Sequence, residues 1–304
     1  MELESIKGRT NVIKASTNIG VYILDDKNCV LIDTGLSNNY GKRIDKVLQK
    51  EQIRPKYIIN THHHIDHSGG NRYFNENYPE LQICVSKKTK THLTYPYIGT
   101  AVYCSGSPIK KFEDNKYHKV DVILEPGIHK FDNYEFEIIS LEGHSDDQIG
   151  IITPDDVCFL GDSIFGSEVL KKYSFPYLYD IKKSIETLEL IKQIEADYFV
   201  ISHSKNILNR EEIIELVDEN MKNINNYIEQ MLEFLRQPMT REELLQKITI
   251  ANDLSVNYKQ YYFNFSTLSS FISYLYNEGL IKNSIENGKL YYCSSEVQPY
   301  FTCK

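Results

Sequence analysis

The strongest constraint in this sequence is a run of four histidines and one aspartate within six residues. The run is His62-His63-His64-Ile65-Asp66-His67, in a chain that has only nine histidines. It follows Tyr57–Asn60, an apolar stretch that predicts a strand, and precedes Ser68-Gly69-Gly70. A turn between a strand and a helix lets several side chains converge, and imidazole beside a carboxylate suits zinc. The sequence therefore predicts a metal site at this turn, which can supply ligands to two ions.

Short apolar runs alternate with helical patterns through the first two thirds of the chain. Amphipathic patterns over Asn39–Gln49 and Asp180–Ile194 predict helices. Two groups of strands packed sheet on sheet, with helices outside, give an αββα layering, so we predict an α/β fold of this kind. The predicted strands are Ile19–Leu24, Cys29–Ile32, Tyr57–Asn60, Gln82–Val85, Val120–Leu124, Tyr134–Ile139, Ile149–Ile152, Val157–Leu160 and Tyr198–Ile201.

Beyond Ser204 the pattern becomes mostly helical. The capping box Thr240-Arg241-Glu242-Glu243 opens one helix, and Asn287-Gly288 is a strong hairpin signal. Helices followed by a hairpin predict a winged-helix-like unit, so we divide the chain into domains at 1–205 and 206–304. Other predicted elements of this C-terminal domain are helices over Glu211–Leu235 and Leu268–Tyr276 and a hairpin over Leu280–Cys293.

Charge argues against a nucleic-acid-binding tail. Residues 206–304 hold 9 Lys and Arg against 13 Asp and Glu, a net charge of −4, and the whole chain carries −8. A nucleic-acid reader normally presents a basic face. We expect the tail instead to pack against the first domain or to form a homodimer. Its buried surface would be the apolar stripe of Leu268, Phe271, Ile272 and Leu275.

Two further expectations concern location and the site entrance. The first ten residues contain no signal-like apolar run, and nowhere do about 18 apolar residues follow one another, so we expect a cytoplasmic protein without membrane spans. The polar and aromatic stretch Tyr95–Tyr117 is interrupted by prolines and glycines, which favours a lid over the site. Aromatic residues that could line a pocket are Tyr95, Tyr97, Tyr103, Tyr173, Phe175 and Tyr177.

The string from Thr61 to Gly70 resembles the T-H-x-H-x-D-H-x-G-G signature of the metallo-β-lactamase superfamily. The resemblance covers about residues 10–205 and implies an αββα sandwich for this catalytic domain. It also implies three further ligands, each after a strand. His144, Asp162 and His203 occupy those positions.

The resemblance implies a role for each residue of this constellation. One metal ion would be bound by His62, His64 and His144, and a second by Asp66, His67 and His203, with Asp162 bridging the two. Asp33 and Thr61 would orient the ligand loop from outside the ligand shell. His63 would point away from the metals, and His92, His118 and His129 are expected at the surface.

Two divalent ions, zinc being expected and iron or manganese the alternatives, would lower the pKa of a shared water. The resulting hydroxide would attack an acyl substrate, while Asp66 orients it and passes on a proton. Dinuclear β-lactamases of the best-known kind have Cys where this chain has Asp162, so a small-molecule thioester or lactone, as in glyoxalase II, is the preferred substrate. Ser145-Asp146-Asp147-Gln148 replaces a common Pro-Gly turn, and Ser204 replaces a frequent glycine.

Several alternatives stay open at this stage. A ribonuclease or other phosphodiesterase of the same superfamily would use a similar site, and a mononuclear-iron persulfide dioxygenase keeps much of the motif. A non-enzymatic, metal-dependent sensor or scaffold is the remaining alternative. Fold does not decide between them, because unrelated activities share one fold.

Overall fold

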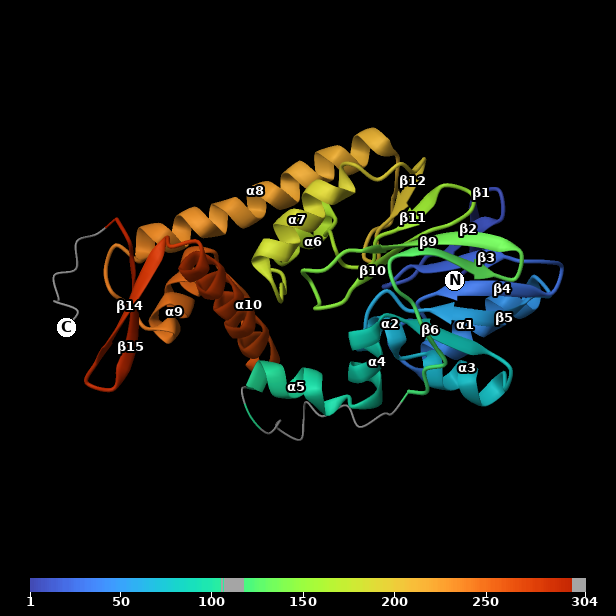
Figure 1. Ribbon diagram of the computed structural model, residues 1–304, viewed down its shortest axis with the longest axis horizontal. Coiled ribbons are helices and arrows are strands. Elements are labelled where there is room, and N and C mark those ends of the chain that lie inside the picture. Colours follow the sequence, from blue (N-terminus) through green and yellow to red (C-terminus); the bar gives the residue numbers. More distant parts are fainter. Residues whose placement is uncertain (105, 107–117, 297–304) are drawn as a thin grey trace.

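Two β-sheets packed face to face form the centre of the larger part of the molecule (Figure 1). The computed structural model describes residues 1–104, 106 and 118–296, the side chain of Tyr103 excepted. The first sheet contains, in spatial order, β1 (Leu3–Lys7), β2 (Thr10–Ile13), β3 (Ile19–Ile23), β4 (Asn28–Ile32), β5 (Arg54–Ile59), β6 (Gln82–Val85) and β7 (Val122–Ile123). The second contains β13 (Ile207–Leu208), β12 (Tyr198–Val200), β11 (Val157–Phe159), β10 (Ile149–Ile152), β9 (Tyr134–Ser140) and β8 (Gly127–Phe131).

Parallel pairing within both sheets decides where the predicted ligands meet. Strands β4, β5 and β6 run parallel, so the residues after Ile32 and Ile59 emerge at the same edge of the first sheet. Strands β11 and β12 are likewise parallel in the second sheet, and their carboxyl ends carry the chain toward Asp162 and His203. Ligands from distant parts of the sequence therefore gather at one edge of the sandwich.

Apolar side chains fill three layers around these sheets. The inner faces share one core, to which Ile32 and Ile59 contribute from one sheet and Phe136 and Ile151 from the other. Helices cover both outer faces, as the predicted αββα layering requires. They are α1 (Asn38–Lys50) and α3 (Asn71–Asn77) on the first sheet, and α6 (Ser167–Lys172) and α7 (Ile181–Ile191) on the second.

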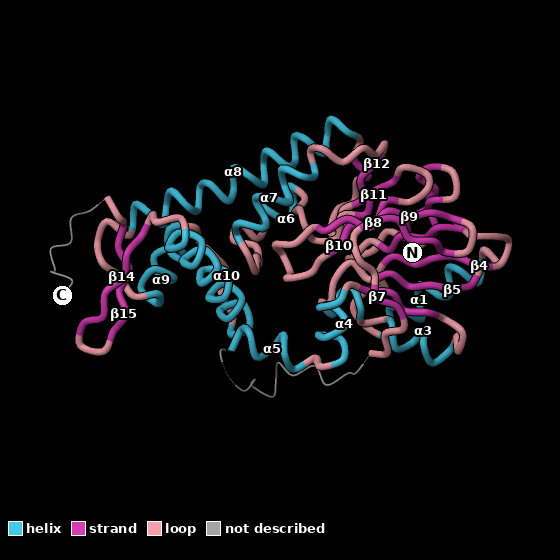
Figure 2. Tube along the Cα trace, viewed as in Figure 1, coloured by secondary structure: helices cyan, strands magenta, loops and turns pink. Residues whose placement is uncertain are grey.

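The C-terminal part begins with α8 (Arg210–Phe234), a long helix that runs from the sandwich to the far end of the molecule (Figure 2). It continues with α9 (Arg241–Ala251), α10 (Tyr258–Asn277) and the hairpin of β14 (Ile281–Glu286) and β15 (Lys289–Ser294). The predicted capping box at Thr240 is present. Helix α10 begins ten residues earlier than predicted, because the Asn257 side chain accepts hydrogen bonds from two backbone N–H groups of its first turn.

One hydrophobic core joins the tail to the sandwich. The predicted stripe of α10 is buried in the same cluster as Ile181 and Leu188 of α7 and Val217 of α8. The expected packing of the tail against the first domain is therefore confirmed. The winged-helix-like organisation, the division at residue 205 and a homodimer stay predictions, although β13 extends the second sheet past that division.

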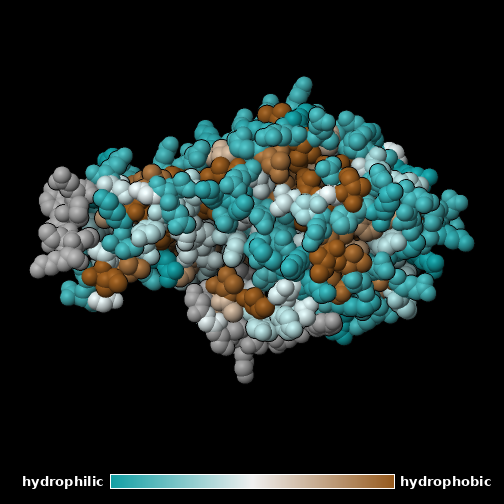
Figure 3. Space-filling model, viewed as in Figure 1, coloured by the Kyte–Doolittle hydropathy of each residue, from teal (hydrophilic) through white to brown (hydrophobic). Residues whose placement is uncertain are grey.

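On the face shown in Figure 3, hydrophilic residues dominate the surface and apolar residues gather in separate patches. Among the described residues, none of the helices combines the length and the apolarity that a membrane span requires.

The expected lid over Tyr95–Tyr117 is only partly described. Residues Tyr97–Cys104 form the helix α5, which follows α4 (Lys87–Thr94) and contacts α10, so this part of the expected lid is helical. Residues 105 and 107–117 lie outside the described residues. The lid hypothesis therefore stays untested.

A close backbone contact positions the loop that carries His144. Gly143 has φ +137°, and its carbonyl oxygen accepts hydrogen bonds from the backbone N–H groups of Tyr179 and Asp180, both at 2.9 Å. A Cβ at this position would lie 2.6 Å from Cα and 2.7 Å from the backbone nitrogen of Ser184 in α7. The loop therefore packs directly on the helix, with no room for a side chain.

Replacing Gly143 should expose this constraint, and Gly127 offers a matched control. Gly127 has φ +129°, and an added Cβ there meets nothing within 4 Å. Both Gly→Ala variants should lose about 1–3 kcal/mol of unfolding free energy through backbone strain. Gly143→Ala should lose about 1–3 kcal/mol more through overpacking against α7. Urea unfolding of both variants measures the difference, and equal losses would contradict the packing argument.

Candidate metal centre

A buried carboxylate, that of Asp33 directly after β4, organises the histidine-rich turn. One oxygen accepts a hydrogen bond from the Thr61 backbone N–H at 2.9 Å. The other accepts from the Thr61 hydroxyl at 2.9 Å and lies 2.7 Å from Nδ1 of His67. The Thr61 hydroxyl also lies 3.1 Å from Nδ1 of His62. The predicted orienting contacts of Asp33 and Thr61 are thus present in the structure.

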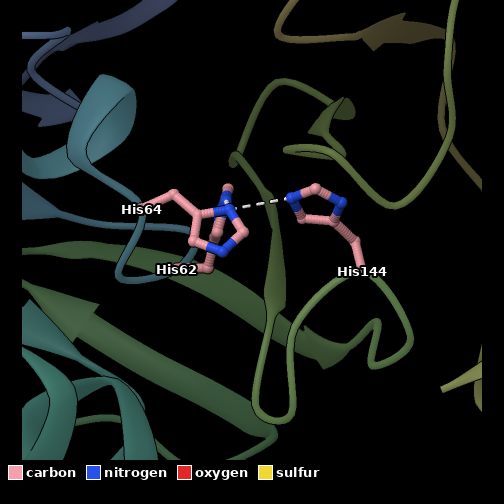
Figure 4. A group of neighbouring side chains, drawn as sticks. All are labelled: His62, His64 and His144. Atoms are coloured by element: carbon pink, nitrogen blue, oxygen red, sulfur yellow. Dashed lines mark hydrogen bonds between the residues drawn. The ribbon is translucent and has the colours of Figure 1, made fainter. Parts of the chain in front are cut away.

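Three imidazoles converge at the end of β5. The Nε2 atoms of His62 and His144 each lie 2.9 Å from Nδ1 of His64, and Figure 4 shows the three rings pointing toward one another. His62 and His64 come from the turn after β5, whereas His144 comes from the loop between β9 and β10. The structure therefore brings together the first predicted ligand group.

Hydrogen bonds to backbone carbonyls orient two of the histidines. Nδ1–H of His144 donates to the carbonyl oxygen of Tyr177 at 2.9 Å, and Nδ1–H of His203 donates to that of Ser16 at 2.7 Å. With Nδ1 engaged in this way, Nε2 is the ring nitrogen that faces the other ligands. An acceptor behind the ring in this way fixes both the tautomer and the ring direction.

The second predicted group comes from α2 (Ile65–Ser68) and from the ends of β11 and β12. Nε2 of His203 lies 3.2 Å from Asp66 Oδ2 and 3.3 Å from Asp162 Oδ2. Nε2 of His67 lies 3.4 Å from Asp162 Oδ1 and 3.7 Å from Asp66 Oδ2. One ligand atom from each of the four side chains therefore falls in a single small cluster.

Asp162 lies between the two groups. Its Oδ2 is 3.3 Å from Nε2 of His203 and 3.6 Å from Nε2 of His144, so one carboxylate oxygen approaches a member of each group. The buried Asp162 Oδ1 and His67 Nε2 atoms have no hydrogen-bond partner among the described residues. Buried polar atoms without partners are costly, and a cation between them would satisfy both.

The charges of these side chains suit a cation. Burial lowers the pKa of His62, His64 and His144, so these imidazoles are neutral at pH 7. Burial alone would raise the pKa of Asp162, but His67 and His203 hold it well below its ordinary value. Neutral imidazole and ionised carboxylate are the forms in which these side chains bind divalent metals. The first group is therefore already in its metal-binding form, whereas His67 and His203 of the second group have to lose a proton before they bind an ion.

A cleft of about 280 Å³ opens beside the first group. It is lined by His64 and His144, by Lys88 and His92 of α4, and by Tyr177 and Tyr179. Of the other aromatic residues predicted to line a pocket, Phe175 is buried in the core. Tyr95, Tyr97 and Tyr173 are exposed and do not line this cleft.

Helix α10 supports one wall of this cleft. The hydroxyl of Ser270 donates to the carbonyl oxygen of Tyr179 at 2.7 Å. The backbone N–H of Leu178 donates to the hydroxyl of Thr267 at 3.3 Å. The C-terminal part therefore reaches the cleft although none of the predicted ligands belongs to it.

The sequence prediction missed a third group beside the cleft. His63, His92 and Asp146 each place one ligand atom within 4.8 Å of the others. His92 was expected at the surface, yet its side chain is only 12% exposed, and His118, also expected there, is 4% exposed. In the sequence, only the Ser145-Asp146-Asp147 string, which replaces a common Pro-Gly turn, indicated that this edge of the cleft differs from the usual pattern.

Asp162→Asn tests whether one carboxylate serves both groups. Loss of its charge should reduce the metal content from about two ions per chain toward one and lower kcat/KM by more than about 100-fold. Asp197→Asn, at an exposed carboxylate paired with Lys7, is the control. Elemental analysis and circular dichroism of both variants measure metal content and folding. Two tightly bound ions in Asp162→Asn would argue against bridging.

Metal binding should release protons at pH 7. Although burial lowers it, the carboxylates of Asp162 and Asp66 raise the pKa of His203 to about 10, and carboxylates also raise that of His67. Both rings are therefore protonated at pH 7 in the metal-free protein, and zinc must displace about two protons from them. Calorimetry in buffers of different ionisation enthalpy measures the release.

A matched variant separates this release from other sources of protons. His203→Asn should release about one proton fewer than the unmodified protein at pH 7. The difference should shrink as the pH approaches 10, where His203 loses its proton without metal. An unchanged release in His203→Asn would show that His203 is not a protonated ligand.

Comparison with known proteins shows the family of this chain and several relatives. Residues 14–203 match the family model described as metallo-beta-lactamase superfamily. A hydroxyacylglutathione hydrolase from Prochlorococcus marinus is 25% identical over 198 residues, which are 62% of this chain and 68% of that protein. Hydroxyacylglutathione hydrolase 1 from Vibrio vulnificus is 26% identical over 213 residues, 69% of this chain and 71% of that protein.

Solved structures extend the likeness of the fold to the C-terminal part. A metallo-beta-lactamase family protein from Thermus thermophilus superposes with a TM-score of 0.71 at 17% identity, covering 95% of this chain and 96% of that one. A beta-lactamase domain protein from Burkholderia ambifaria gives 0.69 at 13% identity, with 96% and 93% coverage. At such identities the likeness concerns the fold alone, and it includes the helical tail.

Proposed function

The chain belongs to the metallo-beta-lactamase superfamily, and from this premise we propose that it is a dinuclear metallo-hydrolase that cleaves thioesters of small molecules. The proposal of a dinuclear site rests on the position of Asp162 between the two ligand groups. The substrate class is supported by the relatives that are named hydroxyacylglutathione hydrolases. We assign the ligands as the sequence predicted them, with His62, His64 and His144 in one group, Asp66, His67 and His203 in the other, and Asp162 shared.

Two divalent ions, of which zinc is the one expected, would supply a Lewis acid and lower the pKa of a water molecule toward neutrality. The protein side chains do the remaining work. Asp66 is ionised, since His67 and His203 outweigh the effect of burial and keep its pKa low. Its side chain is 33% exposed, so it can accept a hydrogen bond from the attacking water, orient it, and pass the proton that the water loses on to solvent.

The leaving group of the reaction explains why a thioester suits this site. An ordinary thiol has a pKa near 8.5, so a thiolate leaves without a dedicated general acid. The proton that Asp66 accepts can then pass to solvent at the open side of the cleft. An amine leaving group, in contrast, would need a proton delivered at the moment of bond cleavage.

The shape of the surface beside the site also supports a two-part substrate. The first cleft meets a second one of about 490 Å³, and Val102 and Tyr179 line both. The second cleft is polar, with Lys182 and Arg241 among its lining residues. An acyl group beside the ligands and a polar thiol carrier in the second cleft would fit this pair of clefts.

A substrate panel tests the proposal. Zinc-loaded protein should hydrolyse acyl thioesters with kcat/KM at least about 100-fold above that for lactones, β-lactams or RNA. A chelator should abolish this activity, and added zinc should restore it, since the ions supply the Lewis acid. The Asp162→Asn variant controls for contaminating esterases. Cleavage of RNA in the absence of thioester hydrolysis would overturn the substrate class and favour the phosphodiesterase alternative.

A further inference from the structure

A third group of metal-binding side chains lies beside the two groups already described. It consists of His63, His92 and Asp146, which come from the turn after β5, from α4 and from the loop after His144. None of the three belongs to the first or second group. Three separate segments of the chain therefore bring a nitrogen or oxygen ligand to one point.

The distances within this group suit a single cation. Nε2 of His92 lies 3.3 Å from Oδ1 of Asp146. Two ligand atoms bound at about 2.0–2.2 Å to a tetrahedral zinc ion lie roughly 3.4 Å apart, close to this value. The ring of His63 stacks on that of His92 with centroids 3.9 Å apart and planes inclined by 14°. The in-plane lone pairs of two stacked rings do not meet, so the His63 ring has to turn about its side-chain torsions before one of its nitrogens can share an ion with His92 and Asp146.

Hydrogen bonding leaves both imidazoles incompletely satisfied. The Nδ1 atoms of His63 and His92 are buried, and neither has a hydrogen-bond partner among the described residues. The side chains of His92 and Asp146 are only 12% and 22% exposed, so water has little access to them. A cation bound at Nδ1 of His63 would satisfy that atom, whereas the His92 nitrogen that faces Asp146 is Nε2 and not the unpartnered Nδ1.

The loop and the helix that carry this group are fixed to each other. The backbone N–H of Lys88 donates to the Asp147 carboxylate at 2.5 Å, and the hydroxyl of Ser86 donates to the Asp147 carbonyl oxygen at 2.7 Å. Nζ of Lys88 donates to the carbonyl oxygen of Asp146 at 2.7 Å. The Asp146 carboxylate therefore faces His92 without a rearrangement of the loop.

We propose that His63, His92 and Asp146 bind a third divalent cation, with zinc as the best match to two imidazoles and one carboxylate. The site is weaker than the other two, because it has three protein ligands instead of four and the ammonium group of Lys88 lies nearby. All three side chains line the cleft together with His64 and His144. A cation there narrows the approach to the dinuclear centre, so excess zinc inhibits the enzyme. The inference does not depend on the substrate class proposed above.

Equilibrium dialysis of the full chain against buffered free zinc tests this site. The unmodified protein should reach three ions per chain, with the third bound more weakly than the first two. His92→Asn and Asp146→Asn should each keep the first two ions and weaken the third by at least about tenfold, as expected for the loss of a ligand. His129→Asn, in β8 and outside all three groups, is the matched control and should keep three ions.

The two tight ions serve as an internal check on folding in every variant. A plateau at two ions in the unmodified protein, or a third ion bound equally well by His92→Asn and Asp146→Asn, would overturn the proposal. Cobalt gives a second measurement, because a third equivalent should add visible absorption in the unmodified protein and in His129→Asn alone. Thioesterase activity does not enter either measurement, so failure of the proposed function and failure of this site are distinguishable.

Discussion

The Asp33 carboxylate is the constraint on which the whole centre depends. It is buried at the end of β4, and it accepts hydrogen bonds from the backbone and the side chain of Thr61 while lying against His67. A buried carboxylate is stable only when its oxygens are satisfied, so the turn after β5 has to fold onto it. These contacts fix both Thr61, at the start of the turn, and His67, its last histidine. The residues between them then project toward the second sheet.

The second sheet supplies the remaining predicted ligands of the metal centre. His144, Asp162 and His203 follow strands that share their inner core with the first sheet, so the spacing between the two halves of the centre is set by packing between the sheets. The carbonyl groups of Tyr177 and Ser16 then orient the rings of His144 and His203 through hydrogen bonds. Because the interior has a low dielectric constant, the carboxylates and imidazoles act on one another strongly.

The local signals in the sequence named side chains that the structure brings together, and what they missed has physical reasons. The histidine run is a local pattern, and the three later ligands each follow a recognisable strand, so all seven could be named and are found together. Of the four strands of the two sheets that were not predicted, β1, β8 and β13 lie at sheet edges. Edge strands are short and partly solvated, so the alternation of apolar and polar residues that marks a strand is weak there.

Burial by distant elements was harder to foresee. His118 has polar neighbours in the sequence, yet it is buried where its backbone N–H donates to the carbonyl oxygen of Leu93. His92 is covered by the loop that carries Asp146, which lies more than fifty residues away in the chain. Composition near a residue cannot report what packs over it, and for this reason the third group beside the cleft escaped the sequence analysis.

The hydrogen bonds from α10 to the segment Leu178–Tyr179 have an evolutionary consequence. Thr267 and Ser270 hold the cleft wall from a part of the chain that contributes no ligand. Substitutions in α10 can therefore reshape the substrate cleft while the metal centre stays intact. Selection for a new substrate can act on the tail and on the dinuclear chemistry separately, so that related chains diverge in specificity without first losing catalysis.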